Sequence, residues 1–181
     1  PAEPVADEHQ RLAVDRGFEL GGAVAVEMAR RRPERVRALV VVAYGQLERP
    51  WDWWQRMLTL TERPSDYLAR AFFEPPNVPS ALLQRLEARL ESPAYRNFLT
   101  PTDAAALEHQ FDGIEVPTLF VGAEQDAILP RRAIEEAAAH VPGSRIEWLA
   151  RCGHLAHMDR SQELLTIIRS FVASVPALES A

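Results

Sequence analysis

The sequence predicts an α/β protein with a mostly parallel sheet, helices on both faces of the sheet and an all-helical insertion. Three observations lead to this fold class. Residues 36–43 (V-R-A-L-V-V-V-A) form a nearly unbroken apolar run, which is typical of a parallel strand covered on both faces. Strand and helix patterns alternate near the beginning of the chain and again near its end. Between these two regions, helical patterns occur without a good strand.

The first predicted elements form one βαβ unit. A strand is expected at residues 11–18, although Asp15 and Arg16 are unusual in a buried strand. A helix is expected at residues 21–32, where a following proline ends it. The apolar run at residues 36–43 then supplies the second strand, so that a short crossover joins two parallel strands.

The alternation resumes after the insertion. Residues 11–46 and 111–175 are therefore expected to form the α/β core, and residues 47–110 the helical insertion. Prolines interrupt the insertion repeatedly, including at Pro64, and Leu82, Leu83, Leu86 and Leu90 form one apolar helical face. The later core elements are predicted to be a strand, a helix, a strand and a closing amphipathic helix, at residues 118–122, 131–140, 145–149 and 161–175.

Composition excludes several classes of function. The 181 residues include 26 acidic and 20 basic side chains, a net charge of −6, so nucleic acid and membrane surfaces are not expected partners. Every basic residue is Arg, which removes chemistry that depends on a P-loop or Schiff-base lysine. The single Cys152 excludes an internal disulfide. No cofactor is implied, and a cytoplasmic location is expected because no signal-peptide or membrane-spanning pattern occurs.

The joint between the first predicted strand and helix reads G-F-E-L-G-G, residues 17–22. Glycines on both sides of a central residue allow a sharp strand–turn–helix corner that forces this residue outward. The central residue is Glu19, and backbone N–H groups near Leu20, at the start of the helix, could stabilise a negative charge. The other interpretation is an ordinary glycine-rich turn with a solvated glutamate.

Two further polar residues follow predicted strands. Asp126 comes after the strand at residues 118–122, with Glu124 as a neighbouring carboxylate, and His154 comes after the strand at residues 145–149. In open parallel sheets, sites form at the carboxyl ends of the strands, and a histidine can exchange a proton near neutral pH. Taken singly, Asp126 is better explained as a helix cap or loop residue, and His154 as a loop histidine without a catalytic task. His157 suggests a metal pair, but no third ligand has suitable spacing, so no metal site is predicted.

The chain order of corner residue, acid and histidine, each after a strand, carries a family resemblance. The stretches G-F-E-L-G-G-A-V-A-V-E-M, V-G-A-E-Q-D-A-I-L-P and G-H-L-A-H-M-D-R resemble the nucleophile elbow, the acid loop and the histidine loop of the α/β-hydrolase superfamily. The resemblance covers roughly residues 17–175. It implies the α/β-hydrolase fold, with residues 47–110 as the lid. It also implies that His154 activates water and that Asp126 orients His154.

The resemblance further implies which residues contact a small-molecule substrate. Phe18 and Leu20 flank the elbow residue, and the N–H of Leu20 would be an oxyanion donor. Trp51 and Trp54 are expected to face the substrate because the first lid helix begins near the site. The alternative is that the lid aromatics pack the lid onto the sheet.

The elbow departs from the usual pattern, because Glu19 stands where most members have Ser. The related epoxide hydrolases and haloalkane dehalogenases use an elbow Asp, and a carboxylate is ionised at neutral pH and can attack an sp³ carbon. Glu19 could instead be a general base, a substrate-orienting group or a disabled position. Asp15, in D-R-G, resembles the nucleophile of some dehalogenases, but it would place the following helix four residues too late.

A second departure concerns the sheet. Family members carry several strands before the elbow, and one of the loops there donates half of the oxyanion hole. Only 16 residues precede Gly17 in this sequence. We therefore expect the N-terminal strands to be absent and a sheet edge to be exposed. Three explanations stay open: a longer protein, self-association or another chain that completes the sheet, or a degenerate remnant.

The expected function is hydrolysis of a small, largely apolar organic substrate of the ester, lactone, epoxide or halide class. Two alternatives stay open. One is a non-hydrolytic or catalytically inactive α/β-hydrolase-like protein that binds a ligand or performs cyclase-like chemistry. The other is a partial chain that is inactive alone.

Overall fold

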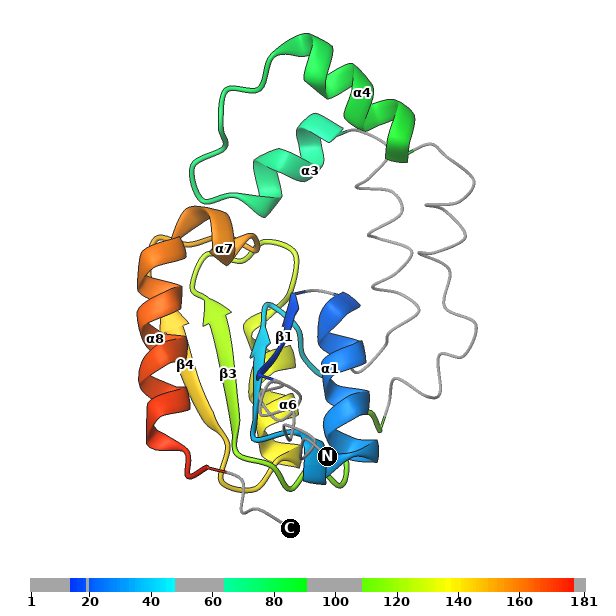
Figure 1. Ribbon diagram of the computed structural model, residues 1–181. Helices are drawn as coiled ribbons and strands as arrows, with labels where there is room; N and C mark the ends of the chain where they lie inside the picture. The colour runs from blue at the N-terminus through cyan, green and yellow to red at the C-terminus, as the bar shows by residue number, and fades with distance from the viewer. Residues whose placement is uncertain (1–13, 19, 48–63, 91–108, 178–181) are drawn as a thin grey trace, which may run out of the picture.

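The structure is a computed structural model that describes residues 14–18, 20–47, 64–90 and 109–177 (Figure 1). Within these residues, a four-stranded sheet has the strand order β1-β2-β3-β4. All three neighbouring pairs are parallel. The strands are β1 Val14–Phe18, β2 Ala38–Val42, β3 Thr118–Ala123 and β4 Arg145–Leu149. Because the strands are parallel, their carboxyl ends share one edge of the sheet, and the loops after β3 and β4 lie there together.

Most of the predicted core elements are found within a few residues of their expected bounds. The first helix, α1, spans Leu20–Arg31, and a short 3₁₀ turn, η2, follows at Pro33–Arg35. Helix α6 and strand β4 have the predicted bounds, Arg131–His140 and Arg145–Leu149. The closing helix, α8, spans Ser161–Ser174, and a single turn, α7 at Ala156–Asp159, precedes it. The predicted parallel sheet with helices on both faces is therefore confirmed.

Strand β2 lies at the centre of the protein, because its alternate residues enter two different cores. Leu39 and Val41 pack with residues of α1 and α6 on one face of the sheet. Val40 and Val42 pack with residues of α8 on the other face (Figure 1). All five residues of β2 are buried, which explains the nearly unbroken apolar run in the sequence. The sheet is thus a rigid middle layer that fixes the loops at its carboxyl edge.

In the described part of the predicted lid, the helices are α3 at Pro64–Ala71 and α4 at Ser80–Leu90. Pro64 begins α3, a position that proline favours because the first helical residues need no N–H partner. Both helices lie beyond the carboxyl edge of the sheet (Figure 1). Ala71 and Phe72, at the end of α3, pack against Ile128 of the loop after β3. The lid boundaries at residues 47 and 110 stay predictions, because residues 48–63 and 91–108 lie outside the described residues.

Strand β1 has one neighbouring strand among those that the structure describes. Asp15 and Arg16 stand in register with Leu39 and Val40 of β2, so this polar pair does lie within a strand. In the part of the chain that is described, no helix is long and apolar enough to cross a bilayer.

Candidate functional site

The predicted elbow lies at the carboxyl end of β1. Phe18 is the last residue of β1 and Leu20 is the first residue of α1. Glu19 lies outside the described residues, as do Trp51, Trp54 and the side chains of Phe18 and Leu20. Of the two glycines that follow, Gly22 is the one under steric constraint, since a Cβ there would lie 2.7 Å from the Tyr44 ring. Helix α1 therefore packs closely against Tyr44, two residues after the end of β2.

The carboxylate of Asp126 is fixed by its own loop. After β3, the chain turns so that Oδ1 of Asp126 accepts hydrogen bonds from the N–H groups of Ile128 and Leu129, each at 2.8 Å. This arrangement caps the turn that leads into α6. It also orients the second oxygen, Oδ2, away from the loop backbone. Asp126 is not the cap of α6, whose N-cap is Pro130, but one of its oxygens does hold the loop before α6 while the other meets His154.

The structure brings His154 and Asp126 together at the carboxyl edge of the sheet. Nδ1 of His154 lies 2.8 Å from Oδ2 of Asp126, and the two side chains are 4% and 5% exposed. An ionised carboxylate can only accept, so Nδ1–H is the donor and Nε2 is the basic nitrogen of the neutral ring. The pair can take a proton at Nε2 while the carboxylate stabilises the imidazolium that forms. This arrangement suits general acid–base chemistry.

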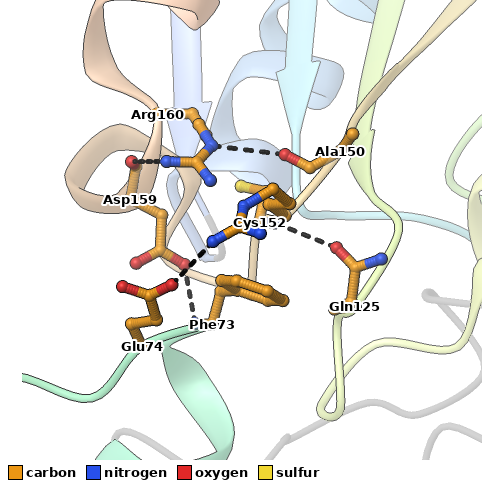
Figure 2. Close-up of polar contacts among 8 residues, drawn as sticks. Phe73, Glu74, Gln125, Ala150, Cys152, Asp159 and Arg160 are labelled. Atoms are coloured by element: carbon orange, nitrogen blue, oxygen red, sulfur yellow. Dashed lines mark hydrogen bonds and ion pairs between the residues drawn. The ribbon is translucent and has the colours of Figure 1, made fainter.

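A reciprocal pair of hydrogen bonds joins the acid loop to the histidine loop. The N–H of Gln125 donates to the carbonyl of Cys152 at 3.1 Å. In return, the N–H of Cys152 donates to the side-chain Oε1 of Gln125 at 3.0 Å (Figure 2). Gln125 directly precedes Asp126, and Cys152 stands two residues before His154. The spacing between the acid and the histidine therefore does not depend on their mutual contact alone.

The sequence motifs did not point to Asp159, whose carboxylate lies next to these two hydrogen bonds between the loops. Asp159 accepts hydrogen bonds from the backbone of Gly153 and of Phe73, which stands just after α3. Asp159 and Phe73 are 86 residues apart in the chain. A contact between residues so far apart in the chain leaves no periodic pattern or motif in the sequence. For Gln125, the only sequence signal is its position beside a candidate acid.

The buried thiol of Cys152 is not a nucleophile at neutral pH. Burial raises the pKa of Cys152 to about 12. Within this shift, the carboxylate of Asp159 contributes to the increase and the guanidinium of Arg160 opposes it. A thiol must ionise before it attacks, so at pH 7 Cys152 is an inert packing residue beneath the histidine loop.

Other candidate ligands do not gather at this edge. Glu124 and His157 are both exposed to solvent. Among the described residues, no group of three or more His, Cys, Asp or Glu side chains could hold a metal ion.

Comparison with known proteins agrees with this fold. Residues 17–167 match the Alpha/beta hydrolase family. A pimeloyl-[acyl-carrier protein] methyl ester esterase of Neisseria meningitidis is 26% identical, over 96% of this chain and 75% of the relative. A 2-hydroxymuconate semialdehyde hydrolase of Pseudomonas putida is 25% identical, over 91% of this chain and 63% of the relative. These relatives are an esterase and a hydrolase.

A solved structure shows the same fold. The 2-hydroxy-6-oxo-6-phenylhexa-2,4-dienoate hydrolase of Rhodococcus sp. strain RHA1 superposes with a TM-score of 0.68 and 18% identity. The match covers 88% of this chain and 63% of that protein. The chain thus spans about three fifths to three quarters of the length of these three proteins.

Proposed function

The chain belongs to the α/β-hydrolase family, and from this premise we propose that it is a hydrolase. Its proposed substrate is a small, largely apolar organic molecule of the ester, lactone, epoxide or halide class. The observation that carries the proposal is the contact of 2.8 Å between His154 and Asp126, buried where the loops after β3 and β4 meet. The relatives support the type of reaction, because they are named as an esterase and a hydrolase.

In the proposed reaction, His154 acts as the general base. Nε2 takes a proton from water, and the oxygen of that water attacks the electrophilic carbon of the substrate. For an ester or lactone, the C–O bond then breaks, and the leaving alkoxide takes the proton back from the imidazolium. Asp126 stabilises the imidazolium between these two steps. Water supplies all the atoms that are added, so the products are an acid and an alcohol.

For an epoxide or halide, we propose that Glu19 acts first. Its carboxylate forms an ester with an sp³ carbon of the substrate, as the halide leaves or as the epoxide oxygen leaves and takes a proton from water. Water activated by His154 then attacks the acyl carbon of that ester. The alkoxide that leaves takes the proton from His154, which leaves Glu19 as a carboxylic acid. This acid gives its proton to the solvent, which restores the carboxylate, and in the epoxide case this proton neutralises the hydroxide formed in the first step. This role rests on the resemblance of residues 17–22 to a nucleophile elbow.

A four-compound panel tests the proposal: p-nitrophenyl acetate, γ-butyrolactone, styrene oxide and 1-bromobutane. We expect turnover of at least one compound, and a loss on the order of 100-fold or more in His154→Ala. Glu19→Gln should abolish turnover of the epoxide or halide and affect esters less. Absence of turnover for all four compounds, or wild-type rates in both variants, would contradict the proposal.

The alternative function is a non-hydrolytic relative that binds a ligand, and the glutamate at position 19 is the observation that favours it. The variant Glu19→Ser separates the two functions. A protein with working acid–base machinery should gain esterase activity with this change, whereas a binding protein should gain none.

A further inference from the structure

One carboxylate oxygen joins the histidine loop to the predicted lid. Oδ2 of Asp159 accepts a hydrogen bond from the N–H of Gly153 at 2.7 Å and another from the N–H of Phe73 at 2.9 Å. Gly153 directly precedes His154, and Phe73 stands two residues after the end of α3. Figure 2 shows Asp159 beside Phe73 and Cys152. Two segments that are distant in the chain are therefore held by a single charged acceptor.

The backbone on the other side of His154 is held to the same part of the lid. The N–H of Leu155 donates to the carbonyl of Ala71 at 3.0 Å. We call residues 71–74 the anchor segment. Hydrogen bonds thus reach the anchor segment from Leu155 directly and from Gly153 through Asp159, so both chain neighbours of His154 are attached to the lid.

The fit between the two backbones leaves no space for a side chain at Gly153. A Cβ added there would lie 2.7 Å from the carbonyl oxygen of Ala71 and 2.7 Å from the N–H nitrogen of Phe73. These atoms belong to backbone, which cannot rotate away as a side-chain end can. Gly153 therefore permits the close approach of the histidine loop to the anchor segment, and the hydrogen bonds of Asp159 hold the two backbones together.

The exposed contacts around this attachment are weaker. Arg151 pairs with Glu74 at 2.9 Å, and its guanidinium lies 5.1 Å from the centre of the Phe73 ring. The Arg151 and Glu74 side chains are 68% and 75% exposed, and exposed ion pairs contribute little. Among the described residues, the part-buried hydrogen bonds of Asp159 and the backbone hydrogen bond from Leu155 to Ala71 are thus the polar links between the lid and the histidine loop that do not depend on exposed side chains.

We propose that Asp159 is a positioning residue, which makes the placement of the His154 imidazole against Asp126 depend on the position of the lid. The expected effect of Asp159 on catalysis rests on the proposed function, whereas its expected effect on the position of the His154 ring does not. A displacement of about 1 Å in a catalytic group can cost on the order of 100-fold in rate. The positions of the lid and of His154, the proposed base, are thereby coupled through the anchor segment.

The test compares three variants of the full chain with a matched control. Asp159→Ala removes the acceptor, Asp159→Asn keeps an acceptor oxygen in place, and Gly153→Ala pushes the anchor segment away by a separate route. Asp112→Ala is the control, because Asp112 also accepts from two partners, His109 and His140, away from the site. The readouts are the ¹⁵N chemical shifts of the His154 ring nitrogens, kcat and KM on the panel, and the melting temperature.

We expect Asp159→Ala and Gly153→Ala to shift or broaden the His154 ring signals and to lower kcat on the order of 10- to 100-fold. Asp159→Asn should retain wild-type ring signals and most of kcat, and Asp112→Ala should change neither. If Asp159→Ala lowers only the melting temperature, the residue is merely structural and the proposal is wrong. If Asp159→Ala does not fold, unchanged ring signals in Gly153→Ala would overturn the proposal. A protein that is inactive on the panel but shows the ring shifts would refute the proposed function and uphold the positioning role.

Discussion

Among the residues that the structure describes, the His154–Asp126 and His140–Asp112 pairs are alike in distance and differ in place. His154 lies 2.8 Å from Asp126, and His140 lies 2.7 Å from Asp112. In each pair the two residues are 28 apart in the chain. Asp126 and His154 follow β3 and β4, whereas Asp112 and His140 precede these strands. One pair therefore stands at the carboxyl edge of the sheet and the other at its amino edge.

Burial separates the two pairs chemically. The side chains of His154 and Asp126 are 4% and 5% exposed, whereas those of His140 and Asp112 are 44% and 49% exposed. Water and salt screen an exposed pair, and its side chains can leave each other at little cost. A buried pair separates at a higher cost, because each partner would lose a hydrogen bond that compensates for its desolvation. The comparison teaches that a short His–Asp distance indicates a proton-transfer site only where burial and strand ends also support it.

The largest expected difference between the two pairs is in stability. Asp126→Ala leaves the N–H groups of Ile128 and Leu129 and the Nδ1–H of His154 without their acceptor, so it should cost about 3–5 kcal/mol in the free energy of unfolding. Asp112→Ala should cost less than about 1 kcal/mol, and added salt should reduce this cost. Urea unfolding of the two variants measures both values. Equal costs would mean that burial does not separate the pairs.

A smaller effect on the free energy of unfolding is expected at alkaline pH. It comes from the thiol of Cys152, near the buried pair. Because burial raises the pKa of Cys152 to about 12 from its usual 9.0, the unfolded chain ionises this thiol first. Stability is therefore full below about pH 9 and falls as the pH rises toward 12, by on the order of 1 kcal/mol from this group at pH 10. Cys152→Ala should remove part of this fall in stability with pH. Part should remain, because burial likewise raises the pKa of Tyr44 to about 12.

Unfolding measured from pH 8 to 11 checks this effect. His140→Ala is the control from the exposed pair and should leave the slope unchanged. A slope that is the same in wild type and Cys152→Ala would show that the thiol ionises as readily in the folded protein as in the unfolded one.

The sequence predicts local elements well where a single physical cause decides them. The run at β2 predicted a strand buried on both faces, and the bounds of α6 and β4 followed from periodicity and turn residues. The order of Asp126 and His154 after two parallel strands was enough to expect them at one edge. Contacts such as Asp159 with Phe73 depend on how the lid lies against the core, which no local pattern encodes. The roles of Glu19, Trp51 and Trp54 stay predictions.

The most direct test of the account is a double-mutant cycle on kcat/KM with one panel substrate, using wild type, Asp126→Asn, His154→Ala and the double variant. If Asp126 acts through His154, Asp126→Asn alone should lower kcat/KM on the order of 100- to 10,000-fold. In the His154→Ala background, Asp126→Asn should then cause no further loss of kcat/KM. The matched cycle at Asp112 and His140 should show no loss. A full loss from Asp126→Asn in both backgrounds, or none in either, would contradict the claim that the buried pair is one catalytic unit.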